Sequence, residues 1–168
     1  MMTMRLLLIL LCFLPRAVWA QKEEGFAKFV NEDGSLIRGS SVTKFYERQI
    51  PVYNLQTNSG TNSTVLRFSM TTENAANILH QNFLTGKKLL SGEIANTYTN
   101  FSGRLVRYKV NMEDVTIEDF AEADGVVTIQ LRATRMGWTY YSYTKSGLQS
   151  VSSKTGWDAA NRTAWTNF

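Results

Sequence analysis

The chain has 168 residues but only one cysteine and one histidine, and these shortages exclude several kinds of chemistry. A single cysteine excludes an internal disulfide framework and a cysteine-based zinc site. A single histidine leaves no pair to bind a metal, and a nucleophile activated by histidine would have to use His80. We therefore expect no metal, no cofactor and no catalytic residues. The sequence predicts a protein that is not an enzyme.

Long hydrophobic runs are also scarce, and the longest lies in the first 20 residues. Arg5 supplies a positive charge, the nine residues Leu6–Leu14 are apolar, and small residues precede and include Ala20. This order is that of a secretory signal peptide, and the run is shorter than the ~20 residues of a membrane-spanning helix. Leu11 before Cys12 argues against a lipoprotein. We predict cleavage after Ala20, with an uncleaved anchor as the alternative.

Removal of residues 1–20 changes the length, the cysteine content and the net charge of the chain. The mature form has 168 − 20 = 148 residues, begins at Gln21 and contains no cysteine. Its 16 basic and 14 acidic residues leave a net charge of +2, which is weak evidence for a nucleic-acid partner. We expect a single domain over residues 21–168, with no nucleic acid bound and no membrane span after cleavage. Its location is predicted as periplasmic or secreted.

Alternating apolar and polar residues dominate the mature chain. Val106, Tyr108, Val110 and Met112 share one parity, and residues 126–134 repeat the alternation. Further strands are predicted at 26–30, 50–56, 64–71, 88–99 and 137–144. These segments indicate a mainly β protein, with a compact antiparallel β-barrel or sandwich as its core.

One segment breaks the alternation and predicts a helix within residues 71–86. Ala75, Leu79 and Phe83 recur at helical spacing. Thr71 or Thr72 is the expected cap at its start, and Gly86 is the expected end. This helix would flank the barrel. His80 lies beside its apolar stripe, where we expect a boundary histidine; an enzyme that combines His80 with the acids of 113–124 is the alternative.

Charge is unevenly distributed along the second half of the chain. Residues 113–124 carry six acids and no base, while basic residues precede and follow this segment. One interpretation is a solvated acidic hairpin between two strands. The other is a surface of two signs, in which Glu118 and Asp119 meet Arg132 and Arg135 of a neighbouring copy. Such a head-to-tail contact closes into rings.

Aromatic residues gather near the end of the chain. Trp138, Tyr140, Tyr141 and Tyr143 lie within six residues, and two further tryptophans, Trp157 and Trp165, follow. Such clusters most often serve core packing or interfaces. Stacking against a sugar or a base is the alternative use.

The order of these segments resembles the Hcp family (haemolysin-coregulated protein), the tube component of type VI secretion. The resemblance covers roughly residues 66–160. It depends on LRFSMTT (66–72), ENAANILHQNFLTGKKL (73–89), RYKVNMEDVTIEDF (107–120) and VVTIQLRATRMGWTYY (126–141). Its most specific parts are Leu84-Thr85-Gly86-Lys87, Met112-Glu113-Asp114-Val115 and Gly156-Trp157-Asp158.

The resemblance implies a β-barrel flanked by a helix, with six copies forming a ring around a wide channel. Rings of the family stack into a tube, and a loop between early strands reaches the next ring. By position this loop is Thr57–Ser63, which also looks like a mobile loop because it is small and polar. The stacking residues would then be Thr57, Asn58, Ser59, Gly60, Thr61 and Asn62.

The resemblance also implies that Gly86, Gly156, Trp157 and Asp158 shape turns, with Trp157 packing the barrel end. The partners it implies are other copies of the chain, with secreted effectors or components of the secretion machine as further candidates. We therefore predict an exported, non-enzymatic, Hcp-like protein that forms hexameric rings. A periplasmic or extracellular β-barrel module that binds a glycan or a protein is the alternative.

Overall fold

The computed structural model describes residues 23–59, 64–100 and 103–168. The predicted signal peptide and residues 60–63 lie outside the described residues. The elements in chain order are β1 (Glu23–Asn31), β2 (Leu36–Ile37), β3 (Ile50–Ser59), β4 (Thr64–Thr71), α2 (Asn74–Thr85), β5 (Leu89–Asn100), β6 (Gly103–Ala123), β7 (Val126–Tyr143), β8 (Gln149–Asp158) and β9 (Thr163–Ala164). The mainly β fold with one flanking helix is confirmed.

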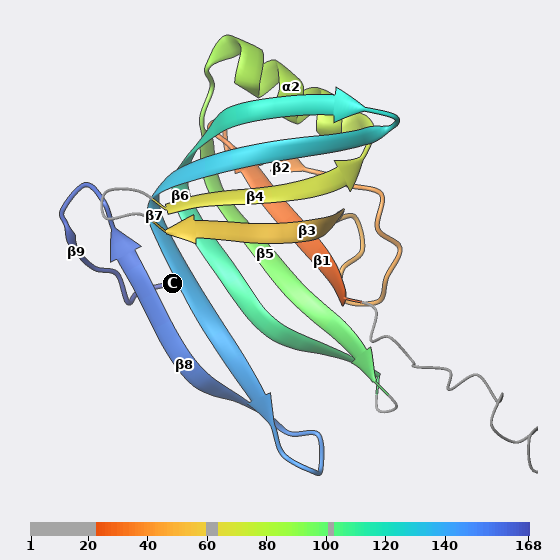
Figure 1. Ribbon diagram of the computed structural model, residues 1–168, viewed down its shortest axis with the longest axis vertical. Helices are drawn as coiled ribbons and strands as arrows, with labels where there is room; N and C mark the ends of the chain where they lie inside the picture. Colours follow the sequence, from red (N-terminus) through yellow and green to blue (C-terminus); the bar gives the residue numbers. More distant parts are fainter. Residues whose placement is uncertain (1–22, 60–63, 101–102) are drawn as a thin grey trace, which may run out of the picture.

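The strands form a single antiparallel sheet that closes on itself in one part and stays open in another. The order is β4-β3-β1-β5-β6-β7-β8-β9, and β4 also pairs with β7. Residues Val126–Arg132 of β7 pair with β4, whereas Arg135–Tyr143 pair with β8. The first half of β7 therefore closes a barrel, and its second half continues with β8 as an open extension (Figure 1).

Alternation places the core inside the barrel, as the sequence predicts, but its phase changes within β6. Val110 and Met112 of β6 are buried, and further along the same strand it is Val115 and Ile117 that are buried. The change occurs at Asp114, whose φ of 51° lies in the left-handed region. The side chains on either side of Asp114 therefore point to opposite faces of the local strand, and the long strand keeps contact with a curved core.

The core consists of large aliphatic and aromatic side chains from every barrel strand. Phe29 and Phe68 stack at 6.0 Å between ring centroids near its centre. Ala75, Ala76 and Leu79 of α2 join the same cluster, so the apolar stripe of the helix lies against the barrel. The helix packs beside β6 at one end of the molecule (Figure 1).

The predicted helix is present, although its predicted N-terminal cap is wrong. The helix begins at Asn74, and Glu73 is the extended residue before it, without a side-chain cap hydrogen bond. The Thr72 hydroxyl instead donates to the Glu122 carboxylate at 2.9 Å. The Thr72 side chain thus makes a tertiary contact with β6, although local capping preferences predict that it caps the helix.

The end of the helix agrees with the prediction. Gly86 adopts φ 66° just after Thr85, and the Lys87 amide donates to the Asn82 carbonyl at 2.9 Å. A glycine adopts this left-handed conformation with less strain than other residues.

One predicted loop is partly a strand in the structure. Thr57, Asn58 and Ser59 belong to β3 and pair with β4, so the loop prediction is wrong for these three residues. The acidic segment from Glu113 to Ala123 is the second half of β6 and pairs with β7, so β6 and β7 form a hairpin. Its turn is at Asp124-Gly125.

Candidate assembly and binding surfaces

Strand β8 is an open edge of the sheet. One side of Gln149–Asp158 pairs with β7, and on the other side β9 pairs only with Trp157 and Asp158. Among the described residues, no strand pairs with the outer side of residues 149–155, and all seven of these residues are exposed. Unpaired strand edges offer backbone donors and acceptors to another chain. The outer edge of β8 at residues 149–155 is thus a candidate surface for assembly.

The charged residues predicted to meet between copies already meet within one chain. Glu118 of β6 forms an ion pair with Arg132 of β7, and it also accepts a hydrogen bond from Gln130 at 3.3 Å. The Arg132 side chain remains 55% exposed, and Asp119 beside Glu118 is exposed. This pair lowers the net charge that the surface offers to a neighbour, while the arginine stays accessible.

Arg135 joins a second charged group at the start of the open extension. Its guanidinium donates to Glu113 at 2.9 Å and to Asp158 at 2.8 Å. The Asp158 carboxylate, only 5% exposed, also accepts hydrogen bonds from the backbone and side-chain amides of Asn161, each at 2.9 Å. These bonds, first that from the Asn161 backbone and then those from the side chains of Arg135 and Asn161, lower the pKa of Asp158 to about 2. Asp158 therefore anchors the turn after β8.

Gly156 and Gly137 are paired across β8 and β7, and the end of the chain covers them. A Cβ added to Gly156 would lie 2.5 Å from the carbonyl oxygen of Trp165, and the ring of Phe168 crowds both glycines. Only a residue without a side chain fits this close approach. Trp157 behaves differently from its predicted role, because it is 42% exposed and lines a cleft instead of packing the barrel end.

His80 faces an aromatic ring and not a catalytic partner. Its imidazole stacks on Phe120 of β6, with 4.3 Å between ring centroids and 8° between the ring planes. Within the described residues, no three histidines, cysteines or acids gather closely enough to hold a metal ion. The histidine packs the helix against β6, as a boundary residue does.

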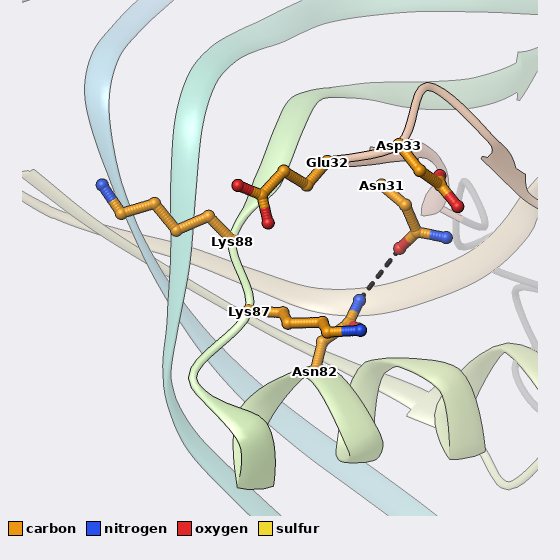
Figure 2. A pocket seen from close by; sticks show the side chains of 6 residues that line it. All are labelled: Asn31, Glu32, Asp33, Asn82, Lys87 and Lys88. Carbon is orange, nitrogen blue, oxygen red and sulfur yellow. Dashed lines mark hydrogen bonds between the residues drawn. The ribbon is translucent and has the colours of Figure 1, made fainter.

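A polar pocket of about 300 Å³ lies between the end of α2 and the turn after β1 (Figure 2). Asn82 donates to Asn31 across it at 2.9 Å, and Lys88 pairs with Asp114 at 2.9 Å. Hydrogen bonds from Ser35 lower the pKa of Asp33 at its rim. Charges of both signs surround this pocket: Glu32, Asp33, Lys87 and Lys88. They balance one another, so the pocket does not select a ligand of one sign.

Within the described residues, none of the helices has the length and apolar character needed to cross a membrane. The described part of the molecule thus combines a closed antiparallel barrel, one helix at its side and an open sheet extension.

This architecture is that of Hcp proteins. No protein-family model matches the sequence, and no curated protein matches it. Solved structures do: Hcp1 from Salmonella typhimurium has a TM-score of 0.68 at 17% identity, covering 85% of this chain and 99% of that one. A structure described as a type six secretion system protein has a TM-score of 0.72 at 14% identity, covering 86% and 100%.

The secreted protein Hcp3 from Pseudomonas aeruginosa is similar as well, with a TM-score of 0.61 at 16% identity, covering 76% of this chain and 96% of that one. These identities are low, so the comparisons establish the fold. The resemblance seen in residues 66–160 is therefore confirmed at the level of the fold, and it extends to most of the described chain.

Proposed function

We propose that this protein is an exported, non-enzymatic component of Hcp type that assembles into hexameric rings and acts in type VI secretion. The observation that carries the proposal is the open edge of β8 on a sheet that otherwise closes into a barrel. The likeness to Hcp structures supports the same function.

An open edge can pair with the same edge of a second copy, which gives a dimer, or with a different surface of a neighbour; the proposed ring takes the second case. A head-to-tail contact of this kind repeats until the ring closes. Backbone hydrogen bonds along the edge contribute about 0.5–1.5 kcal/mol each in net terms, and exposed ion pairs contribute about 0–1 kcal/mol. The strand contact would therefore drive assembly, and the charges around Arg132 would set its register.

Stacking of rings would use the tip of the β3–β4 hairpin. Thr57, Asn58 and Ser59 lie at the end of β3, while Gly60, Thr61 and Asn62 lie outside the described residues. Pairing with β4 fixes the backbone of Thr57, Asn58 and Ser59 next to this tip. We propose this tip as the contact with the next ring.

Export would follow from the predicted signal peptide. A secreted or periplasmic protein beginning at Gln21 is expected, and N-terminal sequencing of the exported protein tests the cleavage site. Partners within a secretion machine, or effectors carried in a ring, belong to the same proposal.

The assembly is tested by light scattering on the mature chain, 21–168, together with electron micrographs of the same sample. We expect a mass of six chains and annular particles. Val151→Lys combined with Ser153→Lys should reduce the ring mass to that of a monomer, because lysines on an edge strand oppose pairing.

The matched control is Val42→Lys with Leu84→Lys. It adds the same charge at two other exposed apolar positions and should leave the rings intact. A wild-type protein that stays strictly monomeric at high concentration would contradict the proposal. Rings that persist in the β8 variant would remove the edge from it.

A second function, a module that binds a ligand, is favoured by one observation. The exposed aromatic residues of β7 and β8 line a common cleft.

A further inference from the structure

An aromatic cleft of about 580 Å³ lies where the end of the β3–β4 hairpin meets β6, β7 and β8. Four of its lining residues are aromatic: Tyr108, Trp138, Tyr140 and Trp157. Threonines and a glycine complete the lining.

Strand register explains why these rings share one face. Tyr108 is paired with Tyr140, and their ring centroids lie 5.6 Å apart at an angle of 43°. Trp138 lies two residues before Tyr140 on the same face and packs against the hydrophobic core. Trp157 is paired with the buried Met136, which extends the row onto β8. The platform is therefore fixed by paired strands and by the core beneath Trp138.

Two rings of this platform remain uncovered. Tyr140 is 40% exposed and Trp157 is 42% exposed. Because Trp157 is paired with Met136, its backbone position lies four residues along β7 from Tyr140, about 13 Å at the usual rise of a strand. A ligand that touches both rings must be extended, with several ring units.

The chemistry of the cleft points to an uncharged ligand rich in hydroxyl groups. None of the described residues that line it carries a charge, and Thr57, Thr64 and Thr155 supply hydroxyl groups at its walls. The other clefts differ: Glu32, Asp33 and two lysines surround the pocket of Figure 2, and an ion pair between Lys109 and Glu93 lies in another.

This combination separates the possible ligands. A nucleic acid would need cations for its phosphates, and the cleft has none among its described lining residues. The apolar face of a sugar ring packs on an aromatic ring, and its hydroxyl groups at the edge can bond to threonine. We propose that this cleft binds a neutral oligosaccharide, laid along β7 with sugar rings stacked on Tyr140 and Trp157. The inference goes beyond ring assembly.

The test is calorimetric titration of the mature chain with cellohexaose, N-acetylated chitohexaose, laminarihexaose and maltohexaose. We expect at least one of these to bind with a Kd of about 1 mM or tighter. Trp157→Ala should weaken that binding at least about tenfold, and Tyr140→Ala should act in the same direction. Trp157→Phe, which keeps a stacking ring, should retain most of the affinity.

Phe45→Ala is the matched control, since Phe45 is an exposed ring outside the cleft, and it should leave binding unchanged. Thermal melting shows whether each variant is folded. Failure of all four sugars to bind would overturn the inference, as would equal binding by the Trp157→Ala variant. If no sugar binds to the wild-type chain and the Trp157→Ala variant loses ring mass, the cleft serves contacts between copies. That result would also overturn the inference.

Discussion

At the scale of single residues, Asp158 is a charged residue that the fold buries and uses to hold a turn. The sequence placed it beside Gly156 and Trp157 in a turn, without indicating its partners. In the fold it accepts hydrogen bonds from Asn161 and Arg135 and is almost fully buried. These partners favour the charged carboxylate, so the group titrates differently in the folded and unfolded chains.

The lowered pKa of Asp158 predicts a definite pH dependence. Because the folded pKa of about 2 lies below the ordinary value of 3.8, this group stabilises the fold above about pH 4. That stabilisation is lost as the pH falls through the window toward 2. Urea denaturation between pH 2 and 7 should show wild type more stable than Asp158→Asn at neutral pH, with the difference shrinking below pH 4.

Glu47→Gln is the control for this series, because Glu47 is an exposed acid on a distant loop. Its stability should follow that of wild type at every pH. A constant difference between wild type and Asp158→Asn across the whole range would show that the carboxylate charge is not what stabilises the turn.

At the scale of elements, the helix shows which local signals act and which are overridden. Gly86 ends the helix as its sequence position predicts, because only the local backbone conformation is involved. The start of the helix follows tertiary contacts, since the hydroxyl of Thr72 bonds to Glu122. The same contrast holds for β3, which pairs with β4 through residues that resemble a loop.

The left-handed conformation of Gly86 allows a test without changes in packing. A Cβ at this position would meet no atom within 4 Å, so Gly86→Ala changes only the backbone energy. We expect Gly86→Ala to lower the free energy of unfolding by about 1 kcal/mol, and Gly86→Asn to lower it less. Urea denaturation measures both. An alanine variant as stable as wild type would contradict the assigned helix end.

At the scale of the whole molecule, the proposed ring depends on the balance between charges inside one chain and charges between copies. Glu118 is paired with Arg132 in its own chain, and Arg132 remains half exposed. A neighbouring copy that contacts Arg132 would therefore find the Glu118 carboxylate already beside it. Charge would guide the register of a ring whose cohesion comes from strand and apolar contacts.

Charge reversal at this place tests that role. Glu118→Lys combined with Asp119→Lys places positive charges beside Arg132 and should weaken rings while the monomer stays folded. Glu32→Lys with Glu47→Lys is the control, because it makes the same change of charge at two other exposed acids. Light scattering measures the ring mass, and circular dichroism confirms the fold. An unchanged ring mass in the Glu118/Asp119 variant would remove electrostatics from the assembly.

The sequence by itself determined the β alternation, the helix around Leu79 and the glycine at its end, because these depend on neighbours within a few residues. The order of segments within residues 66–160 also predicted the Hcp fold. Only the tertiary structure decided that β7 is shared between the barrel and the open extension, that Glu118 meets Arg132, and that Trp157 faces a cleft with Tyr140. These features depend on which strands pair and in which register. Register brings distant residues together, and it depends on how the alternation and the turns of several strands fit one another, not on any one segment alone.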